Sequence, residues 1–442
     1  MEHMTSIAQL LCLSVESKIP QAASLSEVEQ AIRQQMMEAG RQALATYLQK
    51  QHPKYPAETT SCRHCGQEAG YVRLRAAKLH TMLGAVHYER PYYFCGACHH
   101  GTFPLDQALG LRPNQMSAEL ERLGGMTGVE TSFGKGSQLF ASLTLVGLSN
   151  HSLDKAAQAY GREMEKVEQE WQQEASDPEK LAQRKREARR PIRLYGSLDA
   201  AKVHVRGDKE HPWRDLKIGA WFEARGRPPR QPDGEWQIRA ENITYFTNIC
   251  PANAFGPLFW ATGVQRNAHL AQELVILGDG AEWIWNLVAE NFPDAIQIVD
   301  WFHACEYLTP VAQAAFRDAQ KQEAWVKLVK TDLWEGRVAA VIAACEACIR
   351  PDRQDDPAQK AVTYFTNNQD RMDYATYRKN GYQIGSGTIE SAAKQIGLLR
   401  MKVPGAIWNL DGARYVAKAR AAFLSDQWPL LAQRRALLSL AV

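Results

Sequence analysis

The spacing of apolar positions changes along the chain and marks out helical and strand-forming stretches. Residues 27–49 place apolar side chains near a period of 3.6, with Ser26 and Glu29 in the spacing of a capping box. This pattern predicts an amphipathic helix whose apolar stripe suits packing or dimerisation.

Between residues 193 and 303, apolar runs of the strand type give way to alternating helices and strands. The predicted strands span residues 193–205, 213–224, 236–248, 273–277 and 295–299, and the predicted helices span 251–265 and 281–291, with another entered at 300–303. The first three strands should form an antiparallel meander, with a Gly/Pro-rich turn at 226–234. The order strand, strand, strand, helix, strand, helix, strand, helix is that of the ribonuclease-H-like fold, an analogy at the level of fold until a site is identified.

Residues 304–380 are rich in helix-forming side chains, most strongly over 312–344, and we interpret them as a helical insertion into this core. Cys345 and Cys348 lie within the insertion at helical spacing. No second pair of cysteines accompanies them in the sequence, which indicates core positions.

Two C-x-x-C pairs, Cys62 with Cys65 and Cys95 with Cys98, flank strand-like runs at 71–74 and 86–94. Such pairs at the ends of paired strands bring four thiolates to one tetrahedral zinc ion, which predicts a zinc ribbon. Four cysteine ligands leave no position for water, so we assign this Zn²⁺ a structural role. A redox pair is the alternative, and the candidate substitute ligands are His64, His99 and His100.

A candidate helix-turn-helix follows, with helices over 152–160 and 162–174 and a turn at Gly161. The second helix carries five glutamates, which suits a DNA groove poorly, so a plain helical hairpin is the alternative. A basic linker comes next, and its charges either contact phosphate or are simply solvated. The basic residues are Arg184, Lys185, Arg186, Arg189, Arg190 and Arg193.

Composition narrows the class of protein without identifying a partner. A length of 442 residues favours about three domains. The net charge of +3 does not by itself indicate nucleic-acid binding, and nine cysteines without a secretory signal favour thiols and metal ligands over disulfides. The apolar run at residues 10–15 is too short to span a membrane, so we expect a cytoplasmic protein with no membrane partner.

Three carboxylates occupy places that call for an explanation. Asp199 lies in the middle of a predicted strand, where a carboxylate is costly without a cation. Asp279 follows a buried strand in a Gly-Asp-Gly sequence, and Glu390 lies in the first turn of a helix that Ser386 could cap. Taken singly, Asp279 could mark a turn and Glu390 could pair with Lys394. Together they occupy the three places from which this fold converges carboxylates on magnesium, which favours few, hard oxygen ligands.

The chain resembles bacterial insertion-sequence transposases of the ISKra type, relatives of the Mutator superfamily. The resemblance covers nearly the whole chain and rests on residues 197–203, 278–285, the D-x-x-H of 300–303, residues 385–394 and the paired cysteines. It implies that Asp199, Asp279 and Glu390 form a catalytic triad for Mg²⁺ or Mn²⁺. It also implies that Asp300 and His303 are an accessory signature, with His303 either at the scissile phosphate or ordering the site; a buried structural histidine is the alternative.

The resemblance implies a transposase that binds terminal inverted repeats, cuts 3′ strands with water and joins the freed 3′ hydroxyl to target DNA. Such an enzyme would be bacterial and nucleoid-associated, and would act as a dimer or higher oligomer because two DNA ends must be held together. The alternatives are a nuclease of the same fold without strand transfer, a domesticated zinc-containing DNA-binding protein, and a structural zinc-ribbon scaffold. Further candidate DNA contacts are Lys394, Arg400 and Lys402.

The expected organisation is thus a multidomain α/β chain with a ribonuclease-H-like core, preceded by a zinc ribbon and a helical region that could bind DNA. The expected divisions are an N-terminal helical region at 1–58, the zinc ribbon at 59–110, the helical region at 111–182, the catalytic core at 190–303 and 381–428, and the helical insertion at 304–380.

Overall fold

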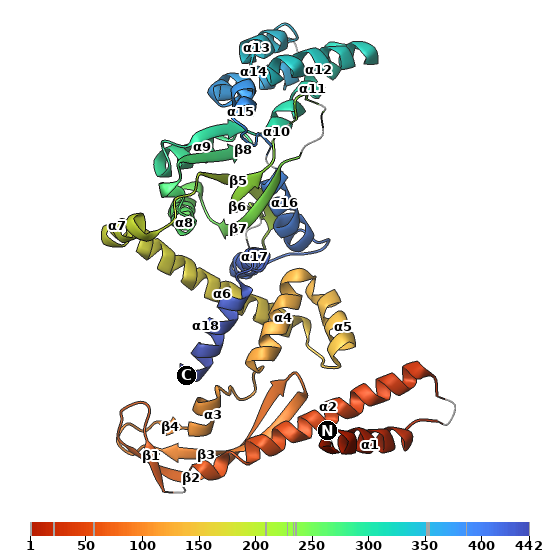
Figure 1. Ribbon diagram of the computed structural model, residues 1–442, viewed down its shortest axis with the longest axis vertical. Coiled ribbons are helices and arrows are strands. Elements are labelled where there is room, and N and C mark those ends of the chain that lie inside the picture. Colours follow the sequence, from red (N-terminus) through yellow and green to blue (C-terminus); the bar gives the residue numbers. More distant parts are fainter. Residues whose placement is uncertain are drawn as a thin grey trace. The chain divides into compact units, whose positions relative to one another are not determined.

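The structure is a computed structural model that describes residues 2–20, 23–55, 58–207, 210–227, 229–232, 234, 237–350, 354–385 and 387–441. The chain forms two compact units (Figure 1). The first unit comprises Met1–Glu163 with Trp428–Val442, and the second comprises Met164–Gln427. Helices and sheets occur together in the chain, which confirms the prediction of a multidomain α/β protein.

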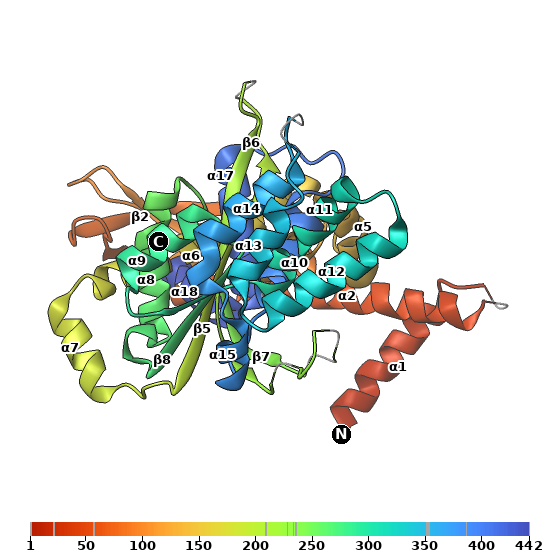
Figure 2. The same ribbon diagram turned by 90° about the horizontal axis from the view of Figure 1, so that it is seen from above.

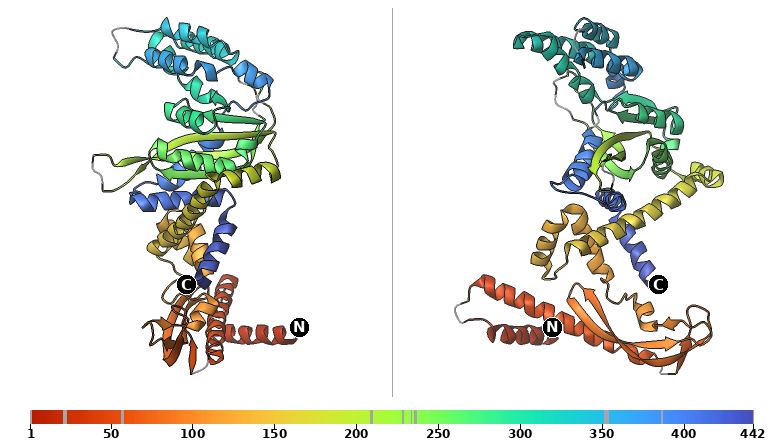
Figure 3. Two further views of the ribbon diagram at one scale, coloured as in Figure 1. Left: turned by 90° about the vertical axis from the view of Figure 1, so that its left-hand side faces the viewer. Right: turned by 180° about the vertical axis from the view of Figure 1, so that it is seen from behind.

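The first unit contains an antiparallel sheet in the order β1-β2-β3-β4. Its strands are β1 (Thr59–Ser61), β2 (Glu68–Thr81), β3 (Gly84–Phe94) and β4 (Gly101–Thr102). The segment between the two cysteine pairs forms the long β2–β3 hairpin, whose curve is seen in Figure 3. Leu79, Val86 and Tyr88 of this hairpin pack with Leu48 in a small buried core. The paired strands predicted between the cysteines are therefore present.

Helices make up the rest of the first unit. They are α1 (Glu2–Glu16), α2 (Leu25–Gln49), the short η1 (His52–Lys54), α3 (Pro104–Leu109), α4 (Ala118–Glu130), α5 (Phe133–Thr144), the start of α6 (Asn150–Ala175), and α18 (Trp428–Ala441). Helix α2 ends where predicted but begins earlier, because Ser24 caps it and forms the capping box with Glu27. The capping box predicted at Ser26 and Glu29 therefore lies two residues earlier in the chain.

The predicted helix-turn-helix at 152–174 was wrong, because α6 is a single helix that runs through Gly161. Ala157, Tyr160, Met164 and Val167 are all buried, so one apolar stripe continues past the glycine at helical spacing. Gly161 can adopt helical backbone angles at a modest cost, and burial of the stripe exceeds that cost. Residues 152–174 therefore do not form a helix-turn-helix motif.

The second unit is built on a mixed five-stranded sheet in the order β7-β6-β5-β8-β9. Its strands are β5 (Arg193–His204), β6 (Trp213–Arg225), β7 (Arg239–Ile249), β8 (Glu273–Gly278) and β9 (Ile296–Val299). The first three pair antiparallel as the predicted meander, and β8 and β9 run parallel to β5. All five predicted strands are confirmed, although Trp236, the predicted start of the third, lies outside the described residues.

Helices cover both faces of this sheet (Figures 1 and 3). They include α8 (Ala252–Gln265), η2 (Ala268–Leu270), α9 (Glu282–Asn291), α16 (Gly387–Ala392), the π-helical stretch η4 (Ala393–Met401) and α17 (Leu410–Leu424). Trp221 of β6 stacks on Phe259 of α8. Ala201 of β5 faces the opposite way, because side chains alternate along paired strands, and it meets Gly397 of η4.

The helices between β9 and α16 gather in one cluster (Figure 2), which contacts β9. They are α10 (Trp301–Glu306), α11 (Leu308–Ala315), α12 (Ala319–Trp334), α13 (Val338–Glu346), α14 (Pro357–Asn368), η3 (Gln369–Arg371) and α15 (Tyr374–Lys379). The predicted helical stretch at 304–380 is confirmed. Cys345 is fully buried, as predicted for a core cysteine, while Cys348 is half-buried.

The residues predicted as a basic linker belong in part to another helix, α7 (Pro178–Glu187). Asp177 caps this helix, and Arg184, Lys185 and Arg186 occupy its last turn, where cations interact favourably with the helix dipole. Among the helices of the described residues, none is long and apolar enough to cross a lipid bilayer.

A buried ion pair joins α6 to α17 in the second unit. Lys418 and Glu168 are in hydrogen-bonding contact, and both side chains are at most 3% exposed. Burial raises the pKa of Glu168, and the Lys418 ammonium opposes this rise. Because removing one partner strands the other charge, Lys418→Met should destabilise the protein by about 3–5 kcal/mol.

The cost of Lys418→Met can be measured by denaturant unfolding followed by circular dichroism. The double variant Glu168→Gln with Lys418→Met removes both charges and should recover part of the loss. Equal stability of Lys418→Met and the wild-type chain would show that the pair contributes nothing.

A candidate acidic site and a cysteine cluster

Asp199 is held in the middle of β5, opposite Ile218 of β6. The backbone N–H of Ala200 donates to its carboxylate over 2.6 Å. The pKa of Asp199 is raised to about 6: burial raises it most, the charges of Asp279 and Glu390 also raise it, and the Ala200 N–H and His303 lower it. These couplings show that the structure brings four sequence-predicted residues into one electrostatic neighbourhood.

Asp279 follows β8 directly and precedes α9. The backbone N–H of Ala281 donates to its carboxylate over 2.9 Å, which fixes the side chain within the turn. Gly280 adopts a φ of +97°, a conformation that other residues rarely take. The Gly-Asp-Gly sequence therefore marks a strand-to-helix turn with a carboxylate held at its centre.

Glu390 lies in the first turn of α16, with its side chain exposed. The proposed cap of this helix, Ser386, lies outside the described residues. The chain then enters η4, where a Cβ placed on Gly397 would come within 2.9 Å of Ala201. This close approach holds the segment after Glu390 against the strand that carries Asp199.

The D-x-x-H residues connect three parts of this neighbourhood. Asp300 is fully buried and caps α10 by accepting a hydrogen bond from the backbone N–H of His303. The backbone N–H of Asp300 donates to Gly278, next to Asp279, and that of Trp301 donates to Ile384, ahead of α16. His303 is partly exposed, with its Nδ1 3.5 Å from the carboxylate of Glu306. The buried member of the pair is thus Asp300, which has a structural role.

Two groups of potential metal ligands among the described residues have all their donor atoms within 4.8 Å of one another, and the three carboxylates are not such a group. The charges of Asp279 and Glu390 contribute to the raised pKa of Asp199, although burial contributes most. Their hard oxygen donors nevertheless suit a divalent cation such as Mg²⁺.

The four cysteines do form a compact group that could hold a metal ion. The sulfur of Cys62 lies 3.6 Å from that of Cys98, and the sulfur of Cys65 lies 3.6 Å from that of Cys95. Sulfurs bound to one tetrahedral zinc at about 2.3 Å would lie roughly 3.8 Å apart, so the spacing fits zinc.

Backbone amides favour the thiolate form at the first cysteine of each pair. The N–H groups of Cys65 and His64 lower the pKa of Cys62 to about 6, and those of Cys98 and Ala97 lower the pKa of Cys95. Thiolate is the form that ligates zinc, and the surroundings favour it at Cys62 and Cys95, whereas the pKa values of Cys65 and Cys98 are raised.

Histidines lie beside the cysteine cluster, as the sequence suggested. The rings of His64 and His100 stack with centroids 3.8 Å apart, and both offer donor atoms close to the sulfur of Cys98. His100 also contacts the backbone oxygen of Cys98 over 2.7 Å through Nδ1. His99 makes the turn after the second pair, with a φ of +59°. A set of His64, Cys98 and His100 therefore stays as the alternative ligand group.

The candidate DNA-contacting cations divide into two classes. Arg400 is 1% exposed and lies over the ring of Trp408, and Arg184 bonds the backbone of Val264 and the side chain of Gln265. Burial removes Arg400 from the candidate phosphate contacts, whereas Arg184 is half-buried and already makes hydrogen bonds within the fold. The other candidates are exposed to solvent: Lys185, Arg186, Arg189, Arg190, Lys394 and Lys402.

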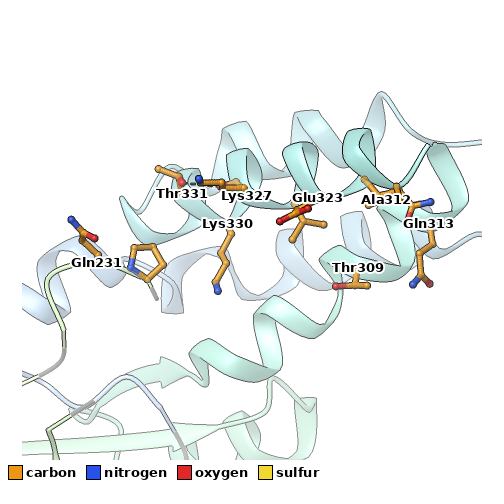
Figure 4. Close-up of a pocket in the computed structure, with 12 residues that line it drawn as sticks. Gln231, Thr309, Ala312, Gln313, Glu323, Lys327, Lys330 and Thr331 are labelled. Atoms are coloured by element: carbon orange, nitrogen blue, oxygen red, sulfur yellow. Dashed lines mark hydrogen bonds between the residues drawn. The ribbon is translucent and has the colours of Figure 1, made fainter. Parts of the chain in front are cut away.

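A cavity of about 640 Å³ lies apart from these residues, between α11, α12 and the β6–β7 connection (Figure 4). Glu323, Lys327 and Lys330 line it with neutral side chains such as Gln313. None of the acidic residues described above borders it, so we do not place the candidate chemistry there.

The raised pKa of Asp199 predicts a pH dependence of stability. Its folded value of about 6 exceeds the ordinary value of 3.8, so the folded state binds the proton more tightly. The resulting stabilisation is complete below about pH 4 and is lost as the pH rises through 6, for a total of about 3 kcal/mol.

Asp199→Asn should lack this pH-dependent contribution. Urea unfolding at pH 4 to 7 without added divalent cation would measure it, because other titrating groups cancel in the comparison with the wild-type chain. Parallel stability profiles for the two proteins would contradict the assignment of a raised pKa to Asp199.

Comparison with protein-family models and with curated proteins finds no match for this chain.

Proposed function

We propose that this chain is a DNA transposase of the acidic-triad kind, with a ribonuclease-H-like core formed by the second unit. The observation that carries the proposal is the electrostatic coupling of Asp199 to Asp279 and Glu390. These residues come from the central strand β5, the end of the adjacent strand β8, and helix α16. Bringing three acids from separate elements together, with one of them largely buried, costs free energy. A cation-dependent activity would explain why the chain bears this cost.

The sheet order β7-β6-β5-β8-β9, with three antiparallel strands followed by two parallel ones, supports the ribonuclease-H-like assignment. The helices α10 to α15 then form an insertion between Asp279 and Glu390. Fold alone does not specify activity, so the proposal depends on the acids rather than on the topology.

Asp199, Asp279 and Glu390 would hold Mg²⁺ or Mn²⁺ through their carboxylate oxygens. When bound, such ions activate an attacking oxygen and stabilise the leaving oxygen in an in-line displacement at phosphorus. The backbone N–H groups of Ala200 and Ala281 orient two of the carboxylates from within the fold. Asp300 orders the start of α10 and thereby the position of His303, which can face a phosphate of the substrate.

Double-stranded DNA is the proposed partner, both as element ends and as target. The exposed cations Lys394 and Lys402 follow Glu390 in the sequence, on η4 and just after it, where they can contact phosphates. The cysteine cluster would hold a structural Zn²⁺ in the first unit. Two copies or more would act together, because strand transfer joins both ends of one element.

The test is incubation of the protein with Mg²⁺ and a labelled duplex that carries the inverted repeats flanking its own coding region. A transposase yields nicked 3′ ends and also longer products in which those ends are joined to target DNA. Nicks without joined products would favour a nuclease of the same fold. Binding without any cleavage, in Mg²⁺ and in Mn²⁺, would overturn the enzyme assignment and leave a DNA-binding protein.

A further inference from the structure

Three tyrosines of the helical insertion donate hydrogen bonds to carbonyl groups beside the acidic site. Tyr364 donates to the backbone oxygen of Asp279 over 2.9 Å, and Tyr374 donates to that of Val299 over 3.0 Å. Tyr377 reaches the backbone oxygen of Gln297 over 3.3 Å. The segment from α14 to α15 is therefore attached to the ends of β8 and β9, and one of its hydroxyls binds a proposed metal-ligating residue directly.

The approach of Tyr364 to Asp279 depends on the neighbouring glycine. A Cβ on Gly280 would lie 2.6 Å from a ring carbon of Tyr364 and 3.0 Å from its hydroxyl. Real Cβ atoms do not approach other atoms so closely, so only glycine leaves room for the tyrosine ring. Gly280 thus permits both the φ of +97° and the contact with the insertion.

Packing fixes Tyr364 from more than one side. Its ring stacks on Tyr307 with centroids 3.9 Å apart and planes 13° apart, and the ring of His303 meets both tyrosines edge-on at about 6 Å. Asn368, one turn further along α14, accepts a hydrogen bond from the indole of Trp285 over 3.1 Å and donates to the backbone oxygen of Tyr364 over 3.0 Å. Helix α14 is thereby held to α9, the helix that follows Asp279.

The hydroxyl of Tyr364 is suited to act as a permanent donor. Its oxygen lies 2.9 Å from the backbone oxygen of Asp279, which has no proton to donate, so the phenol must be the donor in this hydrogen bond. Asp279 is then held at two points, with its backbone oxygen accepting from Tyr364 and its carboxylate accepting from Ala281.

We propose that Tyr364 is a positioning residue through which the helical insertion sets the geometry of Asp279 for a divalent cation. This inference rests on the proposed function and adds to it a role for the insertion in assembling the acidic site. Groups that orient metal ligands from behind commonly change metal affinity by 10- to 100-fold when they are removed. Because Tyr364 acts on the backbone of Asp279, we expect the low end of that range.

The test compares Tyr364→Phe with the matched control Tyr374→Phe, which removes a similar bond to the carbonyl of Val299. Titration calorimetry of zinc-loaded protein with Mn²⁺ measures affinity without any reaction. We expect Tyr364→Phe to weaken Mn²⁺ binding about tenfold and Tyr374→Phe to change it less than twofold. The Mn²⁺ concentration for half-maximal cleavage should shift by the same factor, with the maximal rate little changed.

Unfolding temperatures separate positioning from general stability, since both variants lose one hydroxyl and should be destabilised alike. Wild-type Mn²⁺ affinity in Tyr364→Phe, together with cleavage by the wild-type chain, would overturn this inference and leave the proposed function standing. So would an equal loss of affinity in Tyr374→Phe. Absence of both Mn²⁺ binding and cleavage in the wild-type chain would overturn the proposed function itself.

Discussion

Asp279→Asn should bind DNA normally and lose cleavage activity by about 10³-fold or more. The amide keeps the shape of the side chain and can still accept from the N–H of Ala281 through its oxygen, so the turn after β8 should persist. What it lacks is the negative charge that would bind a divalent cation. Loss of several kcal/mol of transition-state stabilisation corresponds to this factor.

The control for Asp279→Asn is Asp294→Asn, which makes the same chemical change at an exposed position after α9. Gel-shift assays should give similar DNA affinity for both variants and the wild-type chain, and cleavage of a labelled duplex in Mg²⁺ should be lost only in Asp279→Asn. Undiminished cleavage by Asp279→Asn would remove Asp279 from the proposed triad.

The strands of the second unit could be predicted because their local patterns agree with their burial. The run at 274–277 is apolar throughout, and it lies in β8, which has a neighbour on each side in the sheet. Asp199 could be singled out by the same reasoning, since a carboxylate in a strand of this kind is conspicuous. The sequence placed Asp279 at the end of a strand and Glu390 at the start of a helix, and in the structure the charges of both act on Asp199.

Two features could not be predicted because tertiary contacts decide them. Gly161 resembles a turn in the sequence, yet the apolar stripe through Tyr160 and Met164 keeps α6 continuous. Arg400 resembles a surface cation, yet it is buried against Trp408. In both cases the local signal is weaker than the packing that surrounds it.

The role proposed for Tyr364 could not be predicted from the sequence either. The tyrosine and Asp279 are 85 positions apart, and no motif links them. The one available signal was Gly280, since a glycine beside a candidate catalytic acid indicates either an unusual backbone conformation or a close neighbour. In the structure Gly280 has both an unusual backbone conformation and a close neighbour, Tyr364.

Cys95→Ser should abolish zinc binding and unfold the ribbon of the first unit. The packing around the cysteines is small, with Ala69 and Tyr93 as the buried apolar partners of Cys62 and Cys95. A core of this size is too small to keep the cysteine-bearing end of the β1–β4 sheet folded by itself. A structural zinc contributes an apparent 10–16 kcal/mol in small zinc domains. We therefore expect about one zinc per wild-type chain and none in the variant.

Metal analysis of purified protein measures the zinc, and limited proteolysis reports whether residues 59–110 have become accessible. Cys12→Ser, which changes an exposed cysteine of α1, is the control and should keep both zinc and protection. The fold of the second unit should survive in Cys95→Ser, because its core contains none of the four clustered cysteines. Full zinc content and unchanged protection in Cys95→Ser would exclude Cys95 as a ligand and favour the set that includes His64 and His100.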